Sequence, residues 1–209
     1  AREHLRQEKR QPNDLYRIFF YDCPPLTHKA HNPVSQRAID FSRTPTALWR
    51  MAFHDELRRL RKVALRLGYL NHRTGNWRLR PEALRELLSG AISVAALTEQ
   101  DVSYEATQKG VDMRIGLDIA SMAFKRQVDQ IVLVAGDSDF VPAAKLARRE
   151  GIDFILDPMW AKIGADLHEH IDGLRSVIER PALSKASDKP NTGLSIQPSE
   201  TYESAKEDT

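Results

Sequence analysis

The sequence lacks the features that several classes of protein need. It has a single cysteine, Cys23, which excludes an internal disulfide framework and indicates a reducing compartment. No apolar run reaches the roughly 18 residues of a transmembrane helix, and the first residues lack the apolar core of a secretory signal. The formal net charge is only +2 over 209 residues, so charge alone does not demand a nucleic-acid partner. We therefore expect a cytoplasmic protein with no membrane partner.

Several catalytic signatures are also absent. The sequence contains no Walker A loop, no GxGxxG fingerprint and no Gly-x-Ser-x-Gly elbow. His168 and His170 are two residues apart on a predicted helix, so they point to different faces and do not form a zinc-binding pair. The sequence therefore disfavours nucleotide-loop enzymes, serine hydrolases and zinc enzymes.

The central feature of the chain is an apolar run followed by an acidic turn. Residues 131–135 are apolar and rich in β-branched side chains, which predicts a strand buried on both faces, as in a parallel sheet. Gly136 ends this strand and permits a sharp turn. Asp137 and Asp139 follow at once, with Ser138 between them. We expect both carboxylates at the carboxyl end of a buried strand.

The residues after the acidic turn predict a helix and a second buried strand. Pro142 suits the first turn of a helix, and Gly151 suits its end. The apolar run 152–156 follows directly and predicts the next strand. Because ligands bind beyond the carboxyl ends of the strands in such sheets, Asp137 and Asp139 are candidates for a binding site.

Two further acids lie on the predicted helix that follows Gly110. Asp112 falls in its first turn, where a carboxylate also caps amide groups. Asp118 falls on the apolar stripe with Ile115 and Met122, where an unpaired acid is costly. Six residues of helix rotate the chain by about 240°, so the two carboxylates diverge by about 120°. We expect Asp112 at the site, whereas Asp118 is either a secondary member or a structural hydrogen-bonding acid.

A basic stretch precedes these acids. Lys and Arg outnumber Asp and Glu over residues 43–85. A long helix is predicted over 44–67, and it carries a basic cluster of Arg58, Arg59, Arg61, Lys62 and Arg66. A solvated helix face is the more common outcome for such a cluster, and a phosphate-contacting surface is the functional alternative. Trp77, which lies among arginines, is either a core residue or a side chain that stacks a base.

The rest of the chain predicts short elements and a tail. Residues 16–23 form an aromatic strand that ends before Pro24, and Asp22 at its end is interpreted as a turn-forming residue. From Pro181 the composition is polar, which predicts a disordered tail over 181–209. Shorter elements are predicted as helices over 35–41, 81–88 and 165–171 and as strands over 102–107 and 174–178.

The chemistry of the acids suits a hard cation. Carboxylates on separate strand and helix ends, without a cluster of Cys or His, favour Mg²⁺ or Mn²⁺. Such ions typically promote phosphodiester hydrolysis, because they activate water and stabilise the leaving oxygen. We expect Asp112, Asp137 and Asp139 to converge on one metal site.

The motifs Lys109-Gly110-Val111-Asp112 and Gly136-Asp137-Ser138-Asp139-Phe140-Val141-Pro142, with Asp118 between them, resemble the NYN domain of the LabA/DUF88 group, a branch of the PIN-like ribonucleases. The strand end at residues 20–25 resembles the second strand of that group. The resemblance implies a PIN-like three-layer α/β/α sandwich with a mostly parallel sheet, which we assign to residues 1–180.

The same resemblance implies a Mg²⁺- or Mn²⁺-dependent ribonuclease that acts on RNA, and we take single-stranded RNA as the partner. It implies Asp112, Asp137 and Asp139 as catalytic and metal-binding acids, and we add Asp118 to the metal ligands. Lys109 and Ser138 are implied as groups that bind phosphate or order the site. From the basic cluster, we assign Arg58, Arg61 and Lys62 to substrate binding. A homo-oligomer is left open.

The sequence departs from the family pattern at its start. The family begins with a strand that ends in Asp-x-x-Asn, whose Asp is a principal metal ligand, and no such strand precedes Tyr16. Because the sequence starts at Ala1 rather than Met, we expect that strand to lie upstream of it.

Two alternatives to a ribonuclease remain. The first is a non-catalytic RNA-binding or regulatory module of the same fold, which the missing strand and the basic cluster favour. The second is a phosphatase of the haloacid dehalogenase type. Residues 136–139 loosely resemble the acidic turn of such phosphatases. That phosphatase chemistry needs an upstream Asp-x-Asp-x-Thr/Val motif, and the sequence has none.

Overall fold

The structure is a computed structural model that describes residues 14–179, apart from the side chains of residues 72–74 and 138. These residues form two compact units. The first unit contains residues 14–21, Leu57–Arg66 and 110–179, and the second contains Asp22–Glu56 and Leu67–Lys109. The predicted tail over 181–209 lies outside the described residues. Within the described part, no helix has the length and apolar composition needed to cross a membrane.

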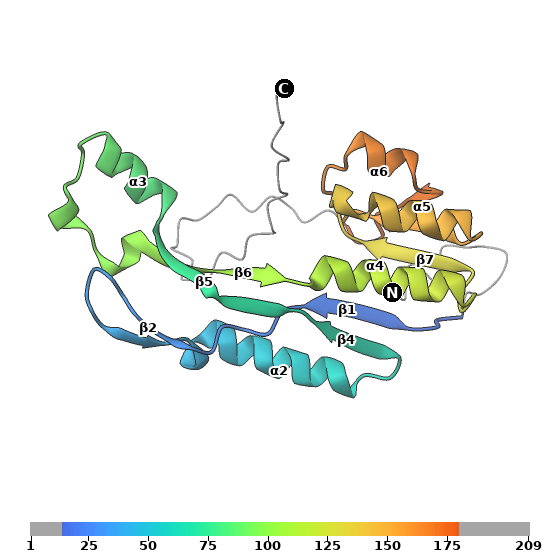
Figure 1. The fold of residues 1–209 in the computed structure, drawn as a ribbon, viewed down its shortest axis with the longest axis horizontal. Helices are drawn as coiled ribbons and strands as arrows, with labels where there is room; N and C mark the ends of the chain where they lie inside the picture. Colours follow the sequence, from blue (N-terminus) through green and yellow to red (C-terminus); the bar gives the residue numbers. More distant parts are fainter. Residues whose placement is uncertain (1–13, 180–209) are drawn as a thin grey trace, which may run out of the picture. The chain divides into compact units, whose positions relative to one another are not determined.

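The first unit is built on a parallel sheet with the order β7-β8-β9. Figure 1 labels β7 of this sheet and the helices α4, α5 and α6 of the same unit. β7 (Gln130–Val134) pairs with β8 (Asp153–Asp157), and β8 pairs with β9 (Gly173–Leu174). Its helices are α4 (Val111–Phe124), α5 (Val141–Arg149) and α6 (Ala165–Glu169). The predicted succession of strand, acidic turn, helix and parallel strand is therefore confirmed, with boundaries that shift by about one residue.

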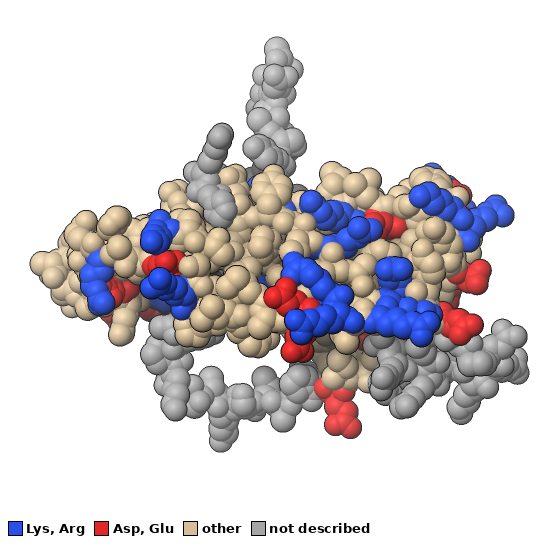
Figure 2. All heavy atoms as spheres, turned by 90° about the horizontal axis from the view of Figure 1, so that it is seen from below, with Lys and Arg blue, Asp and Glu red and all other residues tan. Residues whose placement is uncertain are grey.

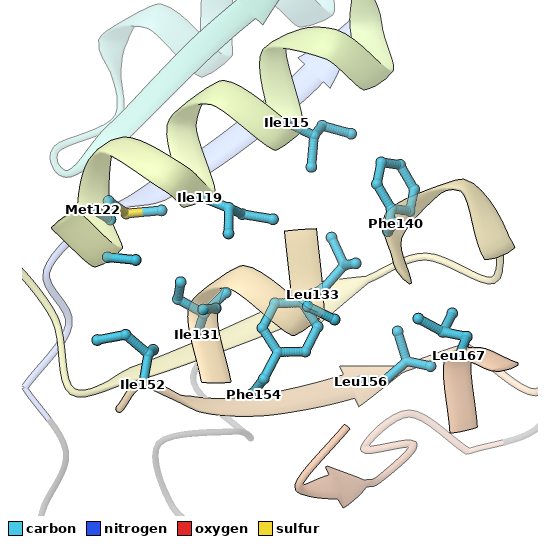
Figure 3. Close-up of a cluster of buried hydrophobic side chains, with 13 residues drawn as sticks. Ile115, Ile119, Met122, Ile131, Leu133, Phe140, Ile152, Phe154, Leu156 and Leu167 are labelled. Atoms are coloured by element: carbon cyan, nitrogen blue, oxygen red, sulfur yellow. The ribbon is translucent and has the colours of Figure 1, made fainter. Parts of the chain in front are cut away.

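The core of this unit lies between α4 and the strands β7 and β8 (Figure 3). Ile115, Ile119 and Met122 point from α4 toward the sheet. The most deeply buried large side chains are Phe154, Leu156 and Leu167. Because burying each such side chain contributes about 1.5–3 kcal/mol, the strands that end at the acidic turn have a rigid support.

The helix after the acidic turn has the end signals that its sequence predicts. Pro142 lies in the first turn of α5, where its missing N–H leaves no helical hydrogen bond unmade. The helix ends before Gly151, whose φ of +83° is a left-handed conformation that a side chain would strain. This short helix then leads directly into β8.

The first unit also contains a two-stranded pairing of β1 (Ile18–Asp22) with β4 (Val63–Leu67). The Ile18 N–H donates to the Lys62 carbonyl oxygen at 2.8 Å. The predicted aromatic strand over 16–23 is confirmed in β1. The predicted helix over 44–67 is wrong in its last part, because α2 (Pro45–Arg59) ends early and a turn and β4 follow.

Two local features explain why this helix ends early. Lys62 has a left-handed φ of 63°, which interrupts a right-handed helix. Val63, Leu65 and Leu67 alternate with Ala64 and the exposed Arg66, which is the period of a strand rather than a helix. The prediction that the basic cluster shares one helix is therefore also wrong.

The second unit is built on the antiparallel pair of β5 (Tyr69–Leu79) and β6 (Val102–Lys109). Its other elements are β2 (Lys29–His31), β3 (Ala38–Asp40), α2, α3 (Pro81–Leu88) and the short 3-10 helices η1 (Phe41–Arg43), η2 (Val94–Ala96) and η3 (Glu99–Asp101). The aromatic rings of Phe41 and Tyr104 pack on Trp77, with centroids 6.4 Å and 5.4 Å from the indole ring. Trp77 is therefore part of an aromatic cluster, as the core alternative expects.

The predicted helix over 35–41 is wrong, since β2 and β3 form a hairpin there. Asn32 is buried, with 1% of its surface exposed, and its side-chain oxygen accepts from the backbone N–H groups of Val34 and Ser35. Asn side chains that bond to the backbone ahead of them stabilise turns in place of helices. The Asn32 turn therefore redirects this segment into the hairpin.

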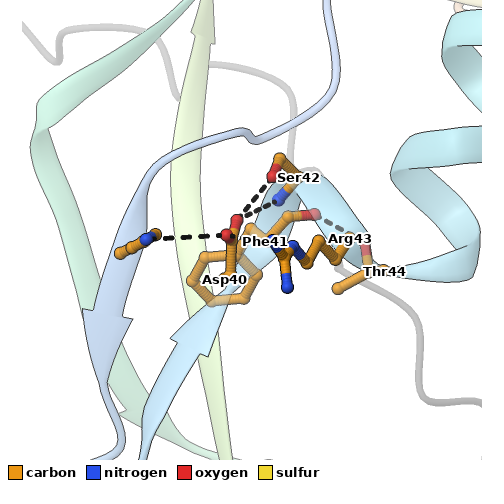
Figure 4. Close-up of polar contacts among 6 residues, drawn as sticks. Asp40, Phe41, Ser42, Arg43 and Thr44 are labelled. Atoms are coloured by element: carbon orange, nitrogen blue, oxygen red, sulfur yellow. Dashed lines mark hydrogen bonds and ion pairs between the residues drawn. The ribbon is translucent and has the colours of Figure 1, made fainter.

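Asp40 ends β3 and caps η1 (Figure 4). Its carboxylate accepts from the Ser42 N–H at 3.1 Å and from the Ser42 hydroxyl, and Lys29 and Arg43 lie 3.8 Å and 3.7 Å from it. The hydrogen bond from the Ser42 hydroxyl is the main cause that lowers the pKa of Asp40. This acid is explained by its capping contacts. The mixed α/β class predicted from the sequence is confirmed for the described residues.

Candidate acidic site

Asp137 and Asp139 lie directly after β7 in the first unit. Residues 135–137 have no regular structure, and η4 (Ser138–Phe140) leads into α5. The Asp139 N–H donates to Oδ1 of Asp137 at 3.1 Å, which fixes the orientation of the Asp137 carboxylate. Phe140 anchors the end of this turn in the core with 5% of its surface exposed. The turn is thus held at both ends, by β7 and by Phe140.

Gly136 packs closely against a distant part of the same unit. A Cβ atom at this position would lie 3.2 Å from Cβ of Ala161, which is tighter than ordinary packing. A side chain at position 136 would therefore crowd Ala161, whereas the turn itself does not require glycine, because the φ of Gly136 is not left-handed.

Asp112 lies in the first turn of α4, after a glycine with left-handed geometry. Gly110 caps the helix with φ of 78° and ψ of 10°, a conformation that glycine adopts without strain. The Asp112 pKa is raised, first by partial desolvation of its carboxyl group and then by the negative charges of Asp137 and Asp139. The residue as a whole is nevertheless exposed. The structure therefore places Asp137 and Asp139 close enough to Asp112 for their negative charges to act on it.

The three acids alone are not arranged as a complete metal site. Among the described side chains, no group of three or more His, Cys, Asp or Glu residues has the arrangement of a metal site. The donor chemistry nevertheless fits a hard cation, because all three groups are carboxylates and a divalent ion would relieve the repulsion that Asp137 and Asp139 exert on Asp112. Asp112, Asp137 and Asp139 are the residues that would hold such an ion.

Asp118 has other partners in the first unit. Its two carboxylate oxygens accept from Nε and Nη2 of Arg66, each at 3.0 Å, and Oδ2 also accepts from the Tyr21 hydroxyl at 3.0 Å. Burial, followed by the hydrogen bond to Asp118, raises the pKa of Tyr21. The Arg66 guanidinium also lies over the Phe19 ring, 5.5 Å from its centroid. These contacts favour the structural alternative for Asp118 over metal ligation.

Replacing Asp118 by asparagine is therefore expected to lower stability rather than metal affinity. The variant leaves Arg66 without its charged partner, and since Arg66 is 45% exposed we expect a loss of about 1 kcal/mol in the free energy of unfolding. Urea denaturation measures the loss, and titration with Mn²⁺ measures the affinity. A large fall in Mn²⁺ affinity at unchanged stability would instead make Asp118 a metal ligand.

The structure places the two other predicted site residues, Lys109 and Ser138, only by the elements that carry them. Lys109 is the exposed last residue of β6 in the second unit, three residues before Asp112 in the chain. Ser138 begins η4, and its side chain lies outside the described part. Their assignment to phosphate binding or site ordering stays a prediction.

The basic cluster is exposed but does not lie on one helix. Arg58 is near the end of α2, Arg61 and Lys62 are in the turn, and Arg66 is on β4 and bound to Asp118. The Lys62 ammonium also donates to the Leu15 carbonyl oxygen. On the face drawn in Figure 2, Lys and Arg side chains stand beside Asp and Glu side chains. Arg58, Arg61 and Lys62 therefore remain candidates for phosphate contact at a turn rather than along a helix.

A buried polar pair in the second unit was not predicted. The Asp22 carboxylate lies 2.8 Å from Nε2 of His54, and Arg50 lies 3.7 Å from the same carboxylate. His54 is 2% exposed. The only local signal of this contact was that His54 lies on the inward face of α2, four residues after Arg50. Asp22 thus holds a buried histidine in addition to the turn role that its sequence suggests.

Comparison with known proteins adds one match. The family model described as the NYN domain matches residues 38–164, which is more than half of the chain. No curated protein and no solved structure shows significant similarity to the chain. The matched region contains both motifs that carry Asp112, Asp137 and Asp139.

Proposed function

Since this chain belongs to the NYN domain family, and so to the PIN-like nuclease superfamily, we propose that it is a Mg²⁺- or Mn²⁺-dependent ribonuclease that hydrolyses single-stranded RNA. The observation that supports the proposal is that the negative charges of Asp137 and Asp139 act on Asp112 and help to raise its pKa. A carboxyl group with a raised pKa beside further carboxylates, such as Asp112, is typical of functional sites. The membership in the LabA/DUF88 group and the location in the cytoplasm remain part of this proposal.

The residues of the chain have distinct tasks in the proposed reaction. Asp137, oriented by the Asp139 N–H, and Asp112, at the start of α4, supply negative charge for the ion from two separate elements. An ion bound there would lower the pKa of a water molecule and stabilise negative charge on the phosphate. Lys109 and Ser138 are proposed to bind or order the phosphate, as the family motifs imply.

Cleavage of a labelled single-stranded RNA by the complete gene product tests the proposal. We expect cleavage in Mg²⁺ or Mn²⁺ that stops in EDTA and resumes when the ion is restored. Binding of RNA without cleavage in either ion would favour the second candidate function, a non-catalytic RNA-binding module of the same fold. The observation that favours this binding module is that the described acids are not arranged as a metal site.

The exposed basic residues Arg58, Arg61 and Lys62 are expected to contact phosphates. Replacing all three by alanine should weaken RNA binding and reduce the slope of log affinity against log salt by about 2, because each lost phosphate contact contributes about 0.7 for single strands. Fluorescence anisotropy over a range of salt concentrations measures this slope. A triple alanine variant at the exposed Lys125, Lys145 and Lys162 is the matched control. Equal slopes in both variants would mean that Arg58, Arg61 and Lys62 make no specific phosphate contacts and only form a solvated surface.

A further inference from the structure

The turn that follows β8 in the first unit has an unusual backbone. Met159 and Trp160 have left-handed φ values of 46° and 68°, although neither residue is a glycine. A side chain strains this conformation, which glycine and asparagine normally occupy. Both side chains are about half exposed, Met159 at 55% and Trp160 at 49%. The protein therefore keeps two large side chains on its surface in a conformation that disfavours them.

Two side chains hold this turn in its strained form. Asp157, the last residue of β8, is 2% exposed and accepts the N–H groups of Met159 at 2.9 Å and Val177 at 3.4 Å. The indole N–H of Trp160 donates to the Ile178 carbonyl oxygen at 2.8 Å. The indole is thus fixed by its polar edge while about half of its surface stays in contact with water. Strained residues that are held in this way cluster at ligand clamps and active sites.

The same segment lies beside the acidic turn. The last residues of β7 and β8 pair with each other in the parallel register, so both chains leave the sheet at one level. Beyond that level, a Cβ atom at Gly136 would lie 3.2 Å from Cβ of Ala161. Gly136 directly precedes Asp137, and Trp160 directly precedes Ala161. The fixed indole and the candidate acidic site therefore share one edge of the sheet, where ligands bind in this architecture.

We propose that the Trp160 indole stacks on one base of the single-stranded RNA that is cleaved at the acidic site, a role that rests on the proposed function. Every base has a π face, so such a contact favours unpaired strands without reading their sequence. An indole that is fixed before the RNA binds loses little conformational freedom in the complex. A base held at Trp160 would also limit which phosphate can reach Asp137.

Binding of a fluorescein-labelled oligouridylate to the complete protein in EDTA tests this contact in the absence of cleavage. Trp160→Leu should raise the dissociation constant by about fivefold or more, because leucine has no π face on which a base can stack. Trp160→Phe should stay within about threefold of the wild type, because it keeps an aromatic face. Both variants lose the hydrogen bond to Ile178, so a purely structural role of Trp160 would weaken binding equally in the two.

Indole fluorescence gives a second readout that does not depend on the leucine variant. A stacked base quenches the emission of the indole, so the oligouridylate should quench part of the wild-type emission and none of that of Trp160→Phe. Trp49 is the matched control, since it is 62% exposed on α2 and stacks on Phe53 with centroids 5.3 Å apart. Trp49→Leu should bind like the wild type, and Trp49→Phe should keep the quenching.

The two proposals can fail separately. Binding that needs an aromatic ring at position 160, without cleavage in Mg²⁺ or Mn²⁺, would keep the stacking role and remove the ribonuclease. Cleavage by a protein whose binding is the same in Trp160→Leu and the wild type would keep the ribonuclease and overturn the stacking role. That role is also overturned if the wild type does not bind the oligouridylate, if Trp160→Leu and Trp160→Phe lose affinity equally, or if quenching survives in Trp160→Phe.

Discussion

Replacement of Asp137 by asparagine is expected to lower metal-dependent cleavage of single-stranded RNA by about 100-fold or more, while RNA binding largely survives. The substitution keeps the size and shape of the side chain but removes one negative charge from the proposed ion site. The ion should then bind more weakly and activate water less effectively. RNA affinity should persist because the proposed phosphate contacts of Arg58, Arg61 and Lys62 are unchanged in this variant.

The position of Asp137 explains why its replacement should lower the rate of RNA cleavage so strongly. It follows β7, whose Ile131 and Leu133 are buried, and its carboxylate is oriented by the Asp139 N–H. Ligands on rigid, packed elements are the ones whose geometry is fixed before the substrate binds. Asparagine retains an oxygen that can accept the same N–H, so the turn should keep its shape and only the charge should change.

Asp129→Asn is the matched control for this experiment. Asp129 immediately precedes β7, whereas Asp137 follows its other end, so the two acids are separated by the length of the strand. The control should cleave RNA at the wild-type rate. Cleavage assays at saturating RNA, together with anisotropy for binding, give the two readouts. If Asp137→Asn changes only stability and leaves cleavage intact, the acidic turn is structural and the nuclease proposal fails at this residue.

The arrangement around Asp137 was predictable because its signals are local. The apolar run before Gly136, the proline in the first turn of α5 and the glycine after it each act within a few residues. Parallel pairing of β7 with β8 follows from a short helix between two apolar runs. The helical rotation predicted that the carboxylates of Asp112 and Asp118 diverge but left the role of Asp118 open, and the structure pairs Asp118 with Arg66.

The errors arose where contacts distant in the chain decide the structure. The segment after Arg59 has apolar residues that suit a helix, yet β4 forms there because β1 offers it a strand to pair with. The residues around His54 in the sequence do not predict that Asp22 lies beside it, because the two are 32 residues apart. The Asn32 turn was missed because its hydrogen bonds are local but its residue type is common in loops of every kind.

Replacement of Asp112 by asparagine should have two opposite effects, on stability and on ion binding. In the folded protein the pKa of Asp112 is raised by desolvation and by Asp137 and Asp139, so the folded state holds this proton more tightly than the unfolded state. The resulting stabilisation is complete below the ordinary aspartate pKa of about 4 and is lost as the pH rises through the raised value. Without an ion, Asp112→Asn should therefore be more stable than wild type near neutral pH.

The same variant should bind Mg²⁺ or Mn²⁺ at least about tenfold more weakly, since one carboxylate of the proposed site becomes an amide. An ion that relieves the repulsion also stabilises the folded state by mass action. Addition of Mn²⁺ should hence raise the thermal midpoint of the wild-type protein strongly and that of Asp112→Asn only slightly. The order of stability of the two proteins should then reverse between EDTA and saturating Mn²⁺.

Asp166→Asn separates this effect from a general loss of charge at a helix start. Asp166 is the second residue of α6, as Asp112 is the second residue of α4. Urea denaturation in EDTA from about pH 4 to pH 8 gives the difference in unfolding free energy between each variant and the wild type. The difference for Asp112→Asn should grow in favour of the variant as the pH rises and then level off, whereas removal of Asp166 should bring no such gain. A difference for Asp112→Asn that does not vary with pH, with no reversal in Mn²⁺, would mean that Asp112, Asp137 and Asp139 do not act as one site.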